Sequence, residues 1–195
     1  PSDGRMSGRS DPAAAFLFRT MLDADNLFLV GPMGSGKSAV GRLLAGRLGL
    51  AFLDSDAEIE ARTGVDIPYI FEQEGEAGFR VRERDVLDEL TARRGVLVAT
   101  GGGAILDPET RERLRSRGRV VYLRTSVNQQ LARTRRSGHR PLLRNPDPLG
   151  TLERLMQVRA PLYEEAADIV VDTDGRKVKS VVEEILRRLD EARGT

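Results

Sequence analysis

The stretch FLVGPMGSGKSAVGRLL, residues 28–44, decides the fold of this 195-residue chain. Within it, residues 31–38 match the pattern GxxxxGK[ST], whose glycines let backbone N–H groups turn inward around phosphate oxygens. An apolar run precedes the pattern and an amphipathic helical pattern follows it, as a phosphate-binding loop requires. The helix N-terminus adds positive charge, Lys37 reaches the β- and γ-phosphates, and the Ser38 hydroxyl binds Mg²⁺. The sequence therefore predicts a site for a nucleoside triphosphate with Mg²⁺.

Short apolar runs alternate with helical patterns along the rest of the chain. The runs lie at 27–30, 51–53, 96–99, 120–123 and 169–171. None of them alternates apolar with polar residues, which is typical of parallel strands buried on both faces. Helical patterns cover 37–48, 80–93 and 178–189, and Asp-Pro pairs at 107–108 and 147–148 indicate helix starts. This order predicts a three-layer α/β/α fold, with helices on both faces of a parallel sheet.

The composition is that of one globular domain, with 39% hydrophobic and 31% charged residues and a net charge of +1. The chain has no cysteine, which excludes disulfides and thiolate metal sites, and its one histidine is His139. The early apolar run at 13–18 is too short to span a bilayer, and no secretory signal is evident. We therefore expect a cytoplasmic protein with no membrane partner.

Basic residues concentrate in one block of the chain. Residues 111–144 contain 11 arginines and one acidic residue, Glu112. Solvated helix faces account for more than half of these arginines, and a compact polyanion such as a nucleotide phosphate chain is a second use for them. A nucleic-acid partner is not expected, because aromatic residues make up only 5% of the chain and no stacking motif is present.

Two aspartates stand where the second apolar run ends. P-loop proteins commonly place an acidic residue at the end of a strand beside the metal, but the run at 96–99 continues into Thr100 without one. The run at 51–53 ends instead in Asp54 and Asp56, separated by Ser55. If the backbone stays extended, both carboxylates face one side, one toward the metal and one toward the hydroxyl of a phosphate acceptor. Alternatively, Ser55 or Asp56 caps the helix that follows.

Further polar and glycine-rich groups follow these aspartates. Arg80 and Glu83 are three residues apart on a predicted helix, so they form either an ordinary ion pair or part of a site. The carboxyl end of the third predicted strand, where ligands bind in open α/β sheets, carries Gly101, Gly102 and Gly103. An arginine-rich segment that breaks at two prolines predicts a mobile lid at about 134–147.

These motifs, in this order, resemble the shikimate kinases, a family of P-loop enzymes similar to nucleoside monophosphate kinases. The match runs from about Asn26 to the C-terminus. It includes the phosphate loop, Asp-x-Asp, Phe-Arg-x-x-Glu, the triple glycine, Arg-Pro-Leu-Leu and Arg-x-Pro-Leu-Tyr. The resemblance implies a five-stranded parallel sheet of order 2-3-1-4-5 with a mobile lid. It also implies MgATP-dependent phosphorylation of the 3-hydroxyl of shikimate, a step of aromatic amino acid biosynthesis.

The resemblance implies a role for each candidate residue. The nucleotide-binding residues are Gly34, Ser35, Gly36, Lys37, Ser38, Ala39, Arg133, Arg140 and Arg176. The substrate-binding residues are Asp56, Arg80, Glu83, Gly101, Gly102, Gly103 and Arg159. The catalytic residues are Lys37, Asp56 and Arg140, and the residues that serve Mg²⁺ are Ser38 and Asp54, the latter through water.

On the acceptor side, the resemblance implies that Arg80 and Arg159 clamp the shikimate carboxylate while Asp56 holds the acceptor hydroxyls. Glu83 positions Arg80 or touches the substrate, and the Gly102 backbone lies beside the ring.

On the nucleotide side, the lid residue Arg140 reaches the γ-phosphate and Arg133 stacks on adenine, whose pocket is lined by residues 173–177. Ala39 stands where threonine is frequent, so we expect slightly weaker nucleotide binding. Ser55 is expected to point away from the site.

Two other functions fit parts of this pattern. A gluconate kinase shares the phosphate loop and the lid, but the two arginines and the triple glycine favour shikimate. A non-catalytic sensor fused to a DNA-binding regulator is expected to have lost Lys37, Asp54 or Arg140, and all three are present. Residues 1–25 are expected to form an N-terminal arm or an extra helix with Met6 as the native start, and 26–195 one monomeric domain.

Overall fold

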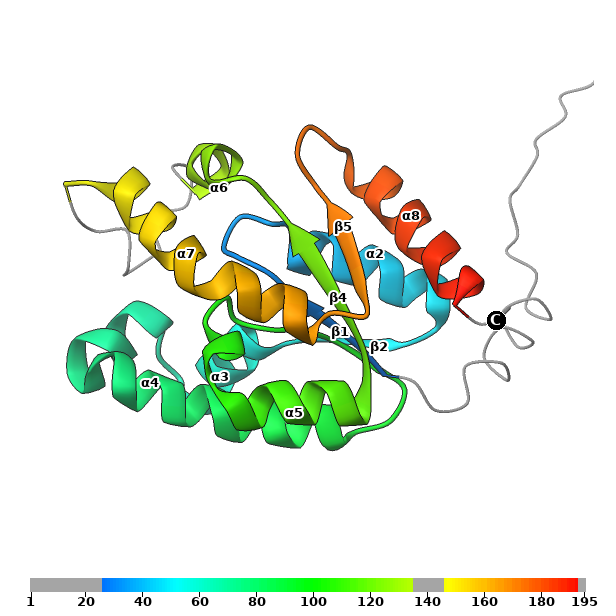
Figure 1. Cartoon of the computed structure of the whole chain (residues 1–195). Coiled ribbons are helices and arrows are strands. Elements are labelled where there is room, and N and C mark those ends of the chain that lie inside the picture. Colours follow the sequence, from blue (N-terminus) through cyan, green and yellow to red (C-terminus); the bar gives the residue numbers. More distant parts are fainter. Residues whose placement is uncertain (1–25, 135–145, 193–195) are drawn as a thin grey trace, which may run out of the picture.

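A computed structural model describes residues 26–134 and 146–192 of the chain (Figure 1). The predicted N-terminal arm, 1–25, lies outside the described residues. Most of the predicted lid, including Arg140, lies outside them as well.

Five parallel strands form one sheet in the order β2-β3-β1-β4-β5. The strands are β1 (Asn26–Val30), β2 (Ala51–Asp54), β3 (Val96–Ala99), β4 (Gly118–Arg124) and β5 (Ile169–Asp172). All residues of β1 and β3 are buried, which is why their sequences do not alternate. The predicted parallel sheet and its strand order are confirmed.

Helices cover both faces of this sheet, as the sequence predicts (Figure 1). On one face, α2 (Lys37–Leu48) and α8 (Val178–Glu191) pack on side chains of β1, β4 and β5. The other face is covered by α4 (Ile67–Ala92), α5 (Pro108–Arg117) and α7 (Pro148–Ala166). The remaining helices are α3 (Ser55–Thr63), the short 3₁₀ turn η1 (Ala104–Leu106) and α6 (Val127–Thr134). None of the helices in the described ranges is both long and apolar enough to cross a membrane.

The strand register brings the candidate site together. Ala99 pairs with Leu29 of β1 on one side and with Asp54 of β2 on the other. Since parallel strands end at the same edge, the phosphate loop after β1, the aspartates after β2 and the glycines after β3 meet there.

The helix predicted at 80–93 is the second part of the longer helix α4, which begins after Asp66. The Asp66 side chain accepts a hydrogen bond from the N–H of Tyr69 and so caps the first turn. Gly75 interrupts the helix with φ 70° and ψ −176°, a backbone conformation that only glycine adopts readily. The break divides α4 into a segment before Gly75 and a segment that carries Arg80 and Glu83.

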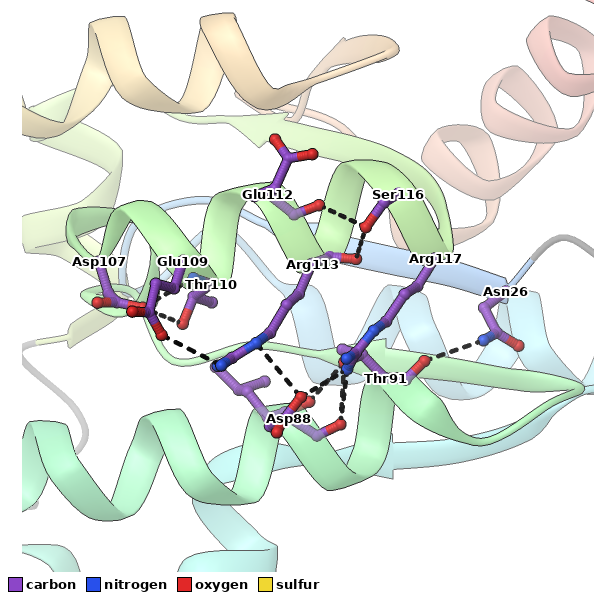
Figure 2. A network of polar contacts seen from close by, with 11 residues as sticks. Asn26, Asp88, Thr91, Asp107, Glu109, Thr110, Glu112, Arg113, Ser116 and Arg117 are labelled. Atoms are coloured by element: carbon purple, nitrogen blue, oxygen red, sulfur yellow. Dashed lines mark hydrogen bonds and ion pairs between the residues drawn. The ribbon is translucent and has the colours of Figure 1, made fainter.

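A polar network holds the C-terminal segment of α4 against its neighbours (Figure 2). Asp88 accepts from Arg117 at 2.8 Å and pairs with Arg113 at 3.3 Å, both on α5. Asn26, the first residue of β1, donates to the carbonyl of Arg93 at 2.6 Å. These contacts fix the helix that presents Arg80 and Glu83 to the sheet edge.

Candidate active site

A pocket of about 300 Å³ opens beside the phosphate loop. Its lining includes Gly34, Gly36, Lys37, Ser38 and Ala39 from the loop and the start of α2. Gly36 has φ 92° at the N-cap of α2, so the chain turns there without a side-chain clash and leaves the first N–H groups of the helix available to phosphate. The Lys37 ammonium donates to the carbonyls of Gly31 and Pro32 at 2.7 and 2.8 Å. The cradle expected from the sequence is therefore present.

Ser38 and Asp54 meet at the mouth of this pocket. The Ser38 hydroxyl donates to the Asp54 carboxylate at 2.6 Å. Mg²⁺ in kinase sites is bound by one or two protein oxygens, and phosphates and waters complete its coordination. These two oxygens fit that need, although no group of three metal-binding side chains occurs in the part of the chain described.

Asp54 also caps α3, which corrects the expectation that Ser55 or Asp56 would do so. Its other carboxylate oxygen accepts from the N–H groups of Asp56 and Ala57 at 3.1 and 3.4 Å. The helix begins at Ser55, so the extended geometry proposed for the two aspartates ends at the first of them. Asp56 reaches the site from the first helical turn instead.

Ser55 is fully buried and does not point away from the site as expected. Its hydroxyl oxygen accepts from the N–H of Gly101 at 2.9 Å. The hydrogen bond of Ser55 thus connects the start of α3 to residues 101–103, here called the glycine loop.

A second pocket, of about 190 Å³, lies between α3, α4, α7 and the glycine loop. Its charged lining residues are Asp56, Glu60, Arg80, Glu83 and Arg159, and its apolar ones include Ile67, Phe71 and Phe79. Asp56, Met33 and Gly102 line this pocket and the first one alike. The two pockets therefore meet at Asp56.

The glycine loop leaves no room for side chains beside the charged groups. A Cβ at Gly101 would lie 2.1 Å from a Glu83 carboxylate oxygen. A Cβ at Gly103 would lie 2.2 Å from the Arg80 guanidinium. A side chain at either outer glycine would have to displace Glu83 or Arg80, so the two glycines let the Arg80–Glu83 pair lie close to the loop.

Arg80 and Glu83 form an ion pair of 2.6 Å, and Arg80 also binds Glu76 at 2.7 Å. Glu83 is 2% exposed, and one of its carboxylate oxygens meets no hydrogen-bond donor within the described ranges. Burial raises the pKa of Glu83 to about 7, because the stabilising charge of Arg80 offsets only part of the lost hydration and Asp56 adds a like charge. The pKa of Glu83 is therefore close to neutral pH.

We expect Glu83→Gln to flatten the pH dependence of the free energy of unfolding. In the folded protein the pKa of Glu83 is about 7, above the ordinary value of 4.5. The contribution of Glu83 to the free energy of unfolding is therefore fully present below about pH 4.5 and is lost as the pH rises through 7. Between these limits the wild type should lose up to about 3 kcal/mol relative to the variant, since one pKa unit corresponds to about 1.4 kcal/mol. Urea unfolding of both proteins at about pH 5 and about pH 8 measures this loss. If the free energies of unfolding of the wild type and Glu83→Gln changed in parallel with pH, this prediction would be contradicted.

Two of the predicted arginines, Arg159 and Arg133, line different pockets. Arg159 is buried on α7 and lines the second pocket with Arg80. Arg133 lines the first pocket, beside the phosphate loop, and donates to the carbonyls of Gly34 and Thr173 at 2.9 and 3.1 Å.

Arg176 lines neither of these two pockets, and its guanidinium pairs with Glu184 of α8 at 2.6 Å. Arg140 lies outside the described residues.

Several lining residues were not predicted. The apolar side chains of Ile67, Phe71 and Phe79 occupy helical positions that are typical of an ordinary core. Tyr163 is fully buried, and its hydroxyl donates to the Gly102 carbonyl. Its place in the motif Arg-x-Pro-Leu-Tyr was the signal that could have drawn attention to it.

Comparisons with known proteins show one family to which this chain is similar. A family model described as shikimate kinase matches residues 33–190. The shikimate kinase of Halorhodospira halophila is 60% identical over 163 residues, which cover 84% of this chain and 92% of the relative. That of Pseudomonas paraeruginosa is 58% identical over 164 residues, covering 84% of this chain and 95% of the relative.

Solved structures of known proteins are also similar to this chain. The structure of shikimate kinase from Acinetobacter baumannii in complex with shikimate matches with a TM-score of 0.87 and 48% identity, covering 91% of this chain and 98% of that one. A gluconokinase from Sinorhizobium meliloti matches with a TM-score of 0.54 and 20% identity over 87% of this chain and 93% of that one, which shows the fold alone. Because the family model spans most of the chain and the relatives are so similar, the chain belongs to the shikimate kinase family.

Proposed function

We propose that this protein transfers the γ-phosphoryl group of ATP to the 3-hydroxyl of shikimate, giving shikimate 3-phosphate and ADP. The observation that carries the proposal is the meeting of two different pockets at Asp56. One, the nucleotide pocket, is lined by the phosphate loop, and the other, the acceptor pocket, carries two arginines that suit the carboxylate of a small acceptor. A transfer between two bound substrates needs this adjacency, because the reacting oxygen must lie in line with the γ-phosphorus.

On the nucleotide side, the N–H groups of the phosphate loop surround the phosphates and Lys37 stabilises their negative charge. Ser38 and Asp54 would hold Mg²⁺, which neutralises charge on the phosphate oxygens when bound. Arg133 and Thr173 form the wall toward the nucleoside. Arg140 remains the predicted ligand of the γ-phosphate, and Arg176 a predicted neighbour of the adenine.

On the acceptor side, Arg80 and Arg159 bind the carboxylate of shikimate and Asp56 accepts a hydrogen bond from the 3-hydroxyl. The hydroxyl oxygen bonds to the γ-phosphorus while the bond from that phosphorus to the β–γ bridging oxygen breaks, and ADP leaves. Asp56 orients the hydroxyl and takes its proton as the new bond forms. The apolar side chains that line this pocket limit the access of water, which could otherwise compete as acceptor.

A measurement of ADP release with three acceptors tests this proposal. Shikimate, gluconate and a nucleoside monophosphate are each supplied with MgATP, and ADP is followed by a coupled assay. We expect rapid turnover with shikimate alone, because only shikimate presents one carboxylate and a ring of hydroxyls that the pocket fits. Turnover with gluconate alone would reject the assignment.

The remaining proposals concern the oligomeric state, the location and the ligands of the protein. We expect the protein to act as a monomer in the cytoplasm, with ATP, Mg²⁺ and shikimate as its ligands and without nucleic acid. A single chain contributes both pockets among the described residues, which supports a site that needs no second copy.

A further inference from the structure

Tyr163 is a buried tyrosine beside the acceptor pocket that the proposed mechanism does not use. It lies on α7, four residues after Arg159, and its ring is fully buried. The ring stacks on Tyr122 of β4, with centroids 4.9 Å apart and planes inclined by 23°. A ring packed in this way has one orientation, so the direction of its hydroxyl is set by the core.

The Tyr163 hydroxyl donates to the carbonyl oxygen of Gly102. Burial raises the pKa of Tyr163 well above its usual range, so the hydroxyl keeps its proton and remains a donor at every physiological pH. The same carbonyl also accepts from Arg159, at the longer distance of 3.4 Å. Tyr163 therefore makes the closer of the two contacts with this carbonyl.

Gly102 is the point at which this contact can affect the substrate. The residue lines both pockets, and a Cβ on it would lie 3.4 Å from the N atom of Met33 in the phosphate loop. The peptide unit between Gly102 and Gly103 is planar, so a fixed carbonyl also fixes the direction of the N–H of Gly103. Neither that N–H nor the N–H of Gly102 donates to another of the described residues. Both N–H groups are therefore without an acceptor in the described part of the chain.

We propose that Tyr163 is a positioning residue that orients the backbone donors of the glycine loop, together with Arg159, toward the carboxylate end of the acceptor. The proposal rests on the proposed function, since it assigns the acceptor pocket to a small carboxylate with hydroxyls. Without the hydroxyl of Tyr163, the Gly102 carbonyl keeps only its long contact with Arg159. The loop would then turn more freely, and Arg159 would be drawn toward the carbonyl and away from the substrate.

The test compares Tyr163→Phe with a matched control, Tyr122→Phe. Both variants remove one hydroxyl from the same stacked pair of buried rings, but only the Tyr163 hydroxyl binds the glycine loop among the described residues. We expect Tyr163→Phe to raise the KM for shikimate roughly 5- to 10-fold, the effect of losing one hydrogen bond, and to change kcat and the KM for ATP less than twofold. Tyr122→Phe should leave all three values within twofold of the wild type.

Each outcome decides the matter. An unchanged KM for shikimate in Tyr163→Phe overturns the proposal. An equal rise in the KM for shikimate and the KM for ATP in Tyr163→Phe also overturns it. The same rise in the KM for shikimate in Tyr122→Phe overturns it as well, since either result would indicate a general loss of structure. If Tyr163→Phe does not fold, Tyr163→Met fills the space with a flexible side chain and gives the same readout. A wild type that does not phosphorylate shikimate would refute the proposed function itself and this inference with it.

Discussion

Asp56→Asn should lower kcat with shikimate by at least about a hundredfold, the lower end of what a positioned proton acceptor contributes. The dissociation constant of ATP should stay within twofold of the wild type. Asparagine has the shape of aspartate but cannot take the proton of the attacking hydroxyl. Asp56 lines both pockets, yet Asp54 is the carboxylate that meets Ser38. The expected result is therefore a defect in chemistry without a defect in nucleotide binding.

Asp54→Asn is expected to differ from Asp56→Asn in its effect on the binding of MgATP. Asp54 binds Ser38 and caps α3, so its replacement should raise the Mg²⁺ concentration needed for half-maximal activity and weaken the binding of MgATP. Steady-state kinetics and calorimetric titration with ATP separate the two effects. If Asp56→Asn weakens ATP binding as much as it lowers turnover, the acceptor role of Asp56 is wrong.

The second large effect is expected from Arg159→Met. Arg159 is 4% exposed, and its Nε atom meets no acceptor in the described ranges, so this donor has no partner there. A hydrogen-bonded charge pair contributes about 1.5–3 kcal/mol, so the KM for shikimate should rise roughly 10- to 100-fold while the KM for ATP stays unchanged. Methionine keeps much of the length of the side chain and removes only the charge and the donors.

A substrate analogue tests whether the carboxylate is the group that Arg159 binds. The methyl ester of shikimate lacks the negative charge, so wild type and Arg159→Met should use it about equally well. Arg154→Met, on the exposed side of the same helix, serves as the control and should leave both KM values unchanged. A variant that loses as much affinity for the ester as for shikimate would show that Arg159 acts on the pocket's structure and not on the carboxylate.

The sequence was informative wherever a functional residue directly follows an apolar run. The phosphate loop and the three glycines could be predicted for this reason, because β1 and β3 are parallel strands that are buried throughout and end at a common edge. Asp54 is the last residue of β2, an edge strand that is only partly buried, and could be predicted from its place after an apolar run. Local geometry at those ends was harder to predict. Ser55, Asp56 and Asp54 are all good capping residues, and only the folded backbone shows that Asp54 is the one used.

Contacts between distant segments could not be predicted from the sequence. The bond from Gly101 to Ser55 joins residues 46 positions apart, and that from Tyr163 to Gly102 joins residues 61 positions apart. The ion pair between Arg176 and Glu184 of α8 was not predicted either, and the place of Arg176 near adenine stays a prediction. Such pairings depend on how helices pack on the sheet, which the periodicity of a single segment does not specify.

The central claim is that one acceptor hydroxyl is held at Asp56, where the two pockets meet. Phosphorus NMR of the products formed from shikimate and MgATP tests it most directly. We predict one new phosphate ester, on the 3-hydroxyl of shikimate, formed in equal amount with ADP by the wild type and in trace amounts by Asp56→Asn. A phosphate on another hydroxyl, or free inorganic phosphate without an ester, would contradict the account.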